Sequence, residues 1–92
     1  MTMGAVADSI SRKLEAAFAP VALEVRDDSA RHAGHEGARE GGESHFDVAM
    51  TSEVFNGLSR VERQRRVNTV LAEELAGPVH ALSLRLKAPG EA

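Results

Sequence analysis

Two segments with the alternating pattern of half-buried strands flank one helical segment, and this order limits the available folds more than any other feature of the chain. In SHFDVAMT (44–51) and VHALSLRLK (79–87), large apolar side chains recur at every second position, so each strand would have one apolar face. Between them, residues 59–76 place apolar side chains at helical spacing. A strand, a helix and a strand of one sheet form a right-handed crossover, so the two strands are expected to run parallel.

The chain before this unit predicts one more helix and one more strand. Residues 5–18 carry apolar side chains at helical spacing, and Pro20 stops the pattern. In VALEVRD (21–27), apolar residues alternate with charged ones, which predicts a strand antiparallel to its successor. Residues 28–43, which join these two strands, form a connection too long for a tight hairpin, and loops of this length are usually functional or mobile.

Local signals mark both ends of the second helix. Ser59 and Glu62 form an S-x-x-E capping box, which satisfies backbone donors at a helix start. Gly77 and Pro78 end the helical pattern. Phe55 lies in the short turn SEVFNGL before the helix and is expected to pack into the core.

The predicted order is therefore helix, strand, strand, helix, strand. At 92 residues the chain holds one hydrophobic core, so residues 1–92 form a single domain. Each strand has one apolar face, so both helices should cover the same side of the sheet. We expect an α+β fold, a two-layer α-β-β-α-β sandwich with a three-stranded mixed sheet. Its structured core spans about 5–88, with a long loop at 28–43 and a frayed tail at 89–92.

Composition excludes several kinds of site. The chain has no cysteine, which rules out disulfides, thiolate zinc sites and a self-contained iron–sulfur cluster. No apolar stretch is long enough to span a membrane, so we expect a cytoplasmic protein without a membrane partner. The net charge is −3, yet RVERQRR (60–66) alone carries +3, which leaves −6 on the remainder.

Three of the four histidines lie within RHAGHEGAREGGESHF (31–46). The predicted topology brings the start of the last strand, where His80 lies, to the same end of the sheet as this segment. Neighbouring strands are about 4.8 Å apart, so His80 would lie within reach of His32 and His35 and could form a two-histidine half-site with one of them. Two simpler interpretations remain: His80 as a structural side chain on the leucine face, and the loop histidines as solvated residues. His45 should lie on or near the open sheet face, as a reserve ligand at best.

Several segments together resemble the BolA family: LEVRDDSARHAGH, GESHFDV, GLSRVERQRRV, LAEEL and PVHALSL. The resemblance extends from about Ile10 to Leu86 and implies a fold similar to a type II KH domain. It also implies a partnership with a monothiol glutaredoxin and a shared [2Fe–2S] cluster, in cluster trafficking or iron regulation. In this chain His80 would be the strand ligand and His32 the loop ligand, with His35 as a substitute. Glutaredoxin and its glutathione would supply the thiolates, so we expect no cluster in the isolated chain.

A second hypothesis is DNA binding, because family members are also described as transcriptional regulators. Arg60, Arg63 and Arg66 recur at three-residue spacing with Arg65 close by, and they are candidates for contacting DNA phosphates or an acidic partner. The alternative is an ordinary solvated helix face. The letters GHEG (34–37) match the GXXG clamp of KH domains but precede the second strand, whereas that clamp would fall at the second helix.

Catalysis is not expected. Carboxylates surround the histidines, but no nucleophile has an adjacent base at suitable spacing. We therefore predict a non-enzymatic protein without a small-molecule substrate. Charged residues on the open sheet face favour a monomer in the absence of the cluster.

Overall fold

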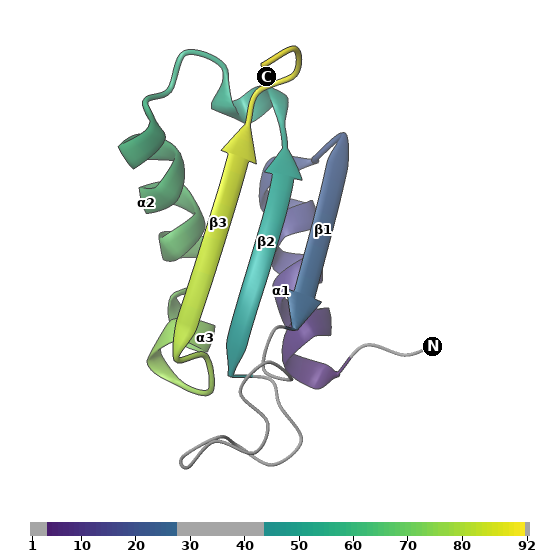
Figure 1. Ribbon diagram of the computed structural model, residues 1–92, viewed down its shortest axis with the longest axis vertical. Helices are drawn as coiled ribbons and strands as arrows, with labels where there is room; N and C mark the ends of the chain where they lie inside the picture. The colour runs from purple at the N-terminus through teal and green to yellow at the C-terminus, as the bar shows by residue number, and fades with distance from the viewer. Residues whose placement is uncertain (1–3, 28–43, 92) are drawn as a thin grey trace.

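The computed structural model describes residues 4–27 and 44–91, and it confirms the predicted α+β sandwich (Figure 1). The predicted loop at 28–43 lies outside the described residues. The elements in chain order are α1 (Ala5–Phe18), β1 (Ala22–Asp27), β2 (His45–Thr51), the 3₁₀ turn η2 (Glu53–Phe55), α2 (Arg60–Val70), α3 (Ala72–Ala76) and β3 (Ala81–Lys87).

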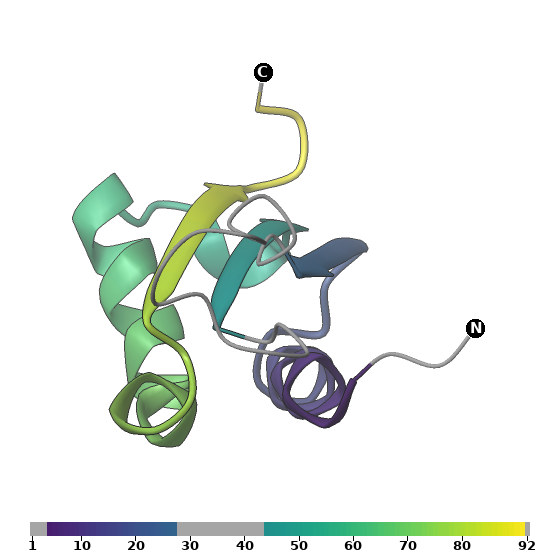
Figure 2. The same cartoon turned by 60° about the horizontal axis from the view of Figure 1, so that its bottom comes forward.

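The sheet has the order β1-β2-β3, with β2 in the centre. β1 pairs antiparallel with β2, and β3 pairs parallel with β2, as the crossover predicts. All three helices lie on one face of the sheet, and the other face is open (Figure 2). Along the open face, three cross-strand rows of side chains follow from the register: Ala22, Thr51 and Lys87; Glu24, Ala49 and Arg85; Arg26, Asp47 and Ser83.

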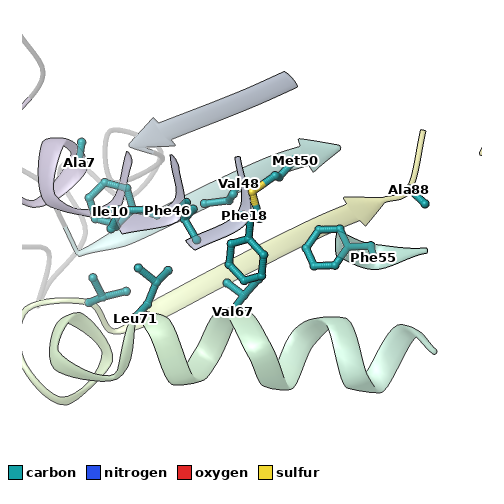
Figure 3. Packing of buried hydrophobic residues seen from close by; sticks show 12 residues of the cluster. Ala7, Ile10, Phe18, Phe46, Val48, Met50, Phe55, Val67, Leu71 and Ala88 are labelled. Atoms are coloured by element: carbon teal, nitrogen blue, oxygen red, sulfur yellow. The ribbon is translucent and has the colours of Figure 1, made fainter. Parts of the chain in front are cut away.

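The core lies between the central strand and the helices. Phe46, Val48 and Met50 of β2 are at most 2% exposed, whereas the corresponding leucines of β3 are only half-buried. Figure 3 shows these β2 side chains facing residues of the helices and of η2. The rings of Phe18 and Phe55 lie 5.3 Å apart, so the predicted insertion of Phe55 into the core is confirmed. Burial of large apolar side chains of this kind contributes about 1.5–3 kcal/mol each.

The local signals of α2 are also confirmed at its start. The Ser59 hydroxyl accepts a hydrogen bond from the Glu62 N–H at 3.1 Å, and the Glu62 carboxylate accepts one from the Ser59 N–H at 2.9 Å. The helix does not run unbroken to Gly77, because it is interrupted at Leu71, where φ is −100° and ψ is 21°. Leu71 is 1% exposed, so the interruption leaves its side chain in the core.

The last strand begins one residue later than the pattern indicated. His80 precedes β3 and is exposed, so its predicted position on the leucine face of the strand is wrong. The Ser44 carbonyl accepts hydrogen bonds from both His80 N–H, at 2.8 Å, and Ala81 N–H, at 3.2 Å. The main chain at His80 is thus fixed to the start of β2, while its side chain faces solvent.

A buried hydroxyl joins the end of α1 to the turn after β2. Ser52 is fully buried, and its hydroxyl donates to the Phe18 carbonyl at 2.6 Å and accepts from the Val54 N–H at 3.1 Å. The Phe18 carbonyl is one of the helix-end acceptors that lack a partner within the helix. Ser52 therefore satisfies two backbone groups where water is excluded.

We predict that Ser52→Ala lowers the free energy of unfolding by about 1–3 kcal/mol, because it removes the side-chain partner of both backbone groups. Urea denaturation followed by far-UV circular dichroism measures the change. The matched control is Ser83→Ala on the exposed face of β3, which should leave the transition unchanged. Equal stability of Ser52→Ala and wild type would contradict the assigned role.

Candidate functional site

One end of the sheet brings together three points of the chain. β1 ends there at Asp27, β2 begins there at His45, and β3 begins there at Ala81 (Figures 1 and 2). Asp27 pairs with Phe46, and His45 pairs with Ala81. The prediction that His32 or His35 approaches His80 lies outside the described residues.

His80 presents an exposed side chain at this end of the sheet. Its exposure excludes a histidine buried among aliphatic neighbours, which was the simpler interpretation of its position in the sequence. The hydrogen bond from its N–H to Ser44 fixes the backbone from which the imidazole projects. A ligand with a fixed backbone loses only side-chain freedom on binding.

His45 lies beside this position, at the start of the central strand. Its side chain is half-buried, and Nδ1 is 2.9 Å from the Ser44 hydroxyl oxygen. It shares the open sheet face with Asp47, as the alternation predicted. Nδ1 lies at hydrogen-bond distance from Ser44, which agrees with the interpretation of His45 as a hydrogen-bonding residue and identifies its partner.

The described part of the chain does not form a complete metal site. Within residues 4–27 and 44–91, no group of three or more His, Cys, Asp or Glu side chains is arranged to hold a metal ion. One exposed imidazole can fit a cluster as a single ligand, while the remaining ligands must come from other residues or another molecule. The donor set is therefore compatible with a shared cluster and incompatible with one held by these residues alone.

The Arg63 side chain packs against the protein and forms hydrogen bonds within the chain. The guanidinium donates from Nε to the Leu58 carbonyl at 3.1 Å and from one terminal nitrogen to the Leu86 carbonyl at 3.3 Å. It also forms two hydrogen bonds with the Glu91 carboxylate, at 2.6 and 2.8 Å, and lies 5.8 Å from the centre of the Phe55 ring. Its side chain is only 11% exposed.

The four arginines therefore do not form one basic face. Arg60, Arg65 and Arg66 are exposed, but they point to different sides of α2. Arg60 borders a groove beside β3, whereas Arg65 and Arg66 border a second one beside Phe18 of α1. Arg63 fixes the region after β3, so phosphate contact through it would require breaking the pair with Glu91.

Glu91 is a residue whose role the sequence did not reveal. The predicted frayed tail folds back, because the Glu91 carboxylate also accepts a hydrogen bond from the Ala88 N–H at 2.9 Å. The signal was the Pro89-Gly90 turn, in which Gly90 has φ of 88°. Bonding to Arg63 and to the Ala88 N–H lowers the pKa of Glu91 from 4.5 to about 2.

Within the described ranges 4–27 and 44–91, no helix has both the length and the apolar content to cross a membrane.

The fold and this sheet end define a small α+β domain in which His80 is the one exposed imidazole among the described residues 4–27 and 44–91. A family model described as BolA-like protein matches residues 14–91. The chain belongs to the BolA family.

The chain is 45% identical to BolA-like protein 1 of Homo sapiens over 89 residues, which cover 97% of this chain and 62% of that protein. It therefore spans about three fifths of the length of that relative. It is 46% identical over 79 residues to the protein of Escherichia coli (strain K12) named DNA-binding transcriptional regulator BolA, which covers 86% of this chain and 71% of that one. Neither name designates an enzyme.

The structure is similar to the BolA domain of SufE1 from Arabidopsis thaliana, with a TM-score of 0.86 and 41% identity. That similarity covers 99% of this chain and all of the other. The solution structure of BolA1 from Mus musculus aligns with a TM-score of 0.79 and 43% identity, over 97% of this chain and 69% of that one.

We predict that Glu91→Gln lowers the urea midpoint at neutral pH, since it weakens the ion pair with Arg63. Because folding depresses the pKa of Glu91 from 4.5 to about 2, its contribution is full above 4.5 and is lost as the pH falls toward 2. The difference in midpoint between wild type and Glu91→Gln should therefore shrink over that range. The matched control is Glu15→Gln, which changes an exposed carboxylate of α1. A difference that stays constant down to pH 2 would show that the charge of Glu91 does not matter.

Proposed function

We propose that the chain is a non-enzymatic adaptor that binds a monothiol glutaredoxin and shares a [2Fe–2S] cluster with it. The observation that carries the proposal is the exposed imidazole of His80, held by its backbone at the end of the sheet where residues 28–43 depart and return. In this arrangement His80 is one ligand, and His32 or His35 is the second. Family membership supports the proposal, since the resemblance in sequence covers both ligand regions.

The chemistry of the ligands assigns a distinct task to each partner. A chain without cysteine cannot provide thiolates, so glutaredoxin and its glutathione hold the other side of the cluster. Neutral imidazole is a suitable ligand for iron, and two histidines in place of two thiolates raise the reduction potential of a [2Fe–2S] centre. A shared cluster of this kind should differ from the all-thiolate cluster of a glutaredoxin dimer in both potential and spectrum.

We predict that reconstitution with a monothiol glutaredoxin, iron, sulfide and glutathione gives a heterocomplex with its own absorption and visible circular dichroism. His80→Ala should abolish this spectrum and leave that of the glutaredoxin dimer, because the fixed ligand is gone. His32→Ala and His35→Ala, measured in the same series, identify the second ligand by which of them has the same effect.

Two controls define the outcome of the reconstitution. Lys87→Ala changes an exposed residue at the opposite end of β3 and should preserve the wild-type spectrum. His45→Ala tests the neighbouring imidazole and should retain the heterocomplex. Identical spectra for wild type and His80→Ala would remove the proposed function.

A second candidate function is transcriptional regulation by direct DNA binding. The observation that favours it is the name of the Escherichia coli relative, together with the exposed Arg60, Arg65 and Arg66. These three residues provide a local positive charge on α2 within an acidic chain. Because Arg63 is engaged with Glu91, and Arg60 points to another side of α2 than Arg65 and Arg66, three arginines are the upper limit for phosphate contact.

Binding of duplex DNA through α2 should weaken with salt in proportion to the contacts made. Three phosphate contacts predict a slope of about −3 in log K against log salt, which fluorescence anisotropy of a labelled duplex measures. The combined substitution of Arg60, Arg65 and Arg66 by alanine should abolish binding. Absence of measurable affinity at physiological salt excludes direct DNA binding.

A further inference from the structure

β3 is an edge strand with unpaired backbone groups. In a parallel pair, alternate residues bond to the neighbouring strand and the intervening ones direct their N–H and C=O to the other side. The Lys87 carbonyl accepts from Ser52 N–H and the Ala81 N–H donates to Ser44, so the odd-numbered residues of β3 bond toward β2. Leu82, Leu84 and Leu86 therefore direct their backbone groups outward.

The side-chain layer beside this edge is also incomplete. Leu82, Leu84 and Leu86 face the same side as the buried residues of β2, yet they remain half-buried. The outward carbonyl of Leu86 accepts a hydrogen bond from the Arg63 guanidinium at 3.3 Å. Among the described residues, no hydrogen bond uses the outward groups of Leu82 and Leu84. Exposed edges of this kind are templates for pairing with another strand.

A groove of about 770 Å³ adjoins the C-terminal half of β3 and continues onto the open sheet face. Leu58, which precedes α2, and Arg60 and Gln64 of α2 line one side of the groove, and residues 84–87 of β3 line another. The groove therefore combines the unpaired backbone groups of Leu84 with apolar side chains and residues of α2, and the unpaired groups of Leu82 continue the edge beyond it. These are the parts used when a protein adds an extended segment to its sheet.

The charged residues around the groove favour a bound segment with acidic side chains. Arg60, Arg85 and Lys87 line it, and Arg85 engages Asp47 through one terminal nitrogen at 3.2 Å. The acidic residue in the lining is Glu24, which lies two strands away from the edge, on β1. An added strand would therefore meet Arg85 and Lys87 on the open face of the sheet, and leucines on the helical face.

We propose that β3 binds an extended segment of a partner protein as a fourth strand, and that this segment alternates acidic and apolar residues. The acidic side chains lie on the open face beside Arg85 and Lys87, and the apolar ones pack against Leu84, Leu86 and Leu58. Backbone hydrogen bonds to Leu82 and Leu84 provide the pairing. His80 precedes the start of β3, whereas the groove adjoins residues 84–87, so the charged part of the surface is separate from the proposed cluster site and only the pairing at Leu82 comes near it.

The test uses a synthetic peptide of alternating glutamate and valine with the folded full chain. Fluorescence anisotropy gives the affinity, and amide hydrogen exchange followed by NMR locates the contact. We expect slower exchange at the amides of Leu82 and Leu84. The double variant Arg60→Glu/Lys87→Glu should bind about tenfold more weakly, from two reversed surface charges. Arg66→Glu, an equal change on the other flank of α2, should bind as the wild type does.

A second peptide separates strand pairing from charge attraction. It has the same sequence with alternate backbone amides methylated, so it keeps its charge and apolar side chains but cannot complete the ladder. The proposal requires that it lose binding. Equal binding of both peptides, protection at other amides, or no binding of the first peptide overturns the proposal. Protection of these amides through self-association of the chain, or by single-stranded nucleic acid alone, also overturns it.

Discussion

Burial of one face of β2 is the interaction on which the rest of the structure depends. One helix before β2 in the sequence, α1, and one after it, α2, both pack against the core that contains Phe46, Val48 and Met50. Both helices must therefore cover the same face of the sheet. This requirement leaves the other face open, and the strand order makes β1 and β3 the edge strands. It also brings the starts of β2 and β3 to one end, where His80 is presented.

The sequence predicted the parts of the fold that depend on local pattern. Alternation gave the faces of the three strands, and the Ser59 and Glu62 pair gave the start of α2. Two features were not predicted from the sequence, because they depend on contacts between residues that are distant in the chain. Arg63 and Glu91 are 28 positions apart, so no spacing rule links them. The alternation of β3 was extended back one step too far, because the strand pairing at Ser44 begins with a shared carbonyl.

The two ends of β3 carry different features. His80 lies before its first residue, and the Arg63–Glu91 pair stabilises the chain just after its last. Seven residues at about 3.3 Å each place these regions roughly 20 Å apart. The groove end of the proposed strand site therefore lies away from His80, while pairing at Leu82 would bring an added strand to within two residues of it.

The pairing of Asp27 with Phe46 fixes the two strand ends that residues 28–43 connect. The described core makes no other demand on the length of this connection, and doubling a flexible connection costs only about 0.6 kcal/mol in closure entropy. The position is therefore suited to exchange of whole segments between relatives. Grafting a connection with another donor residue would change the proposed second ligand while the described scaffold stays the same.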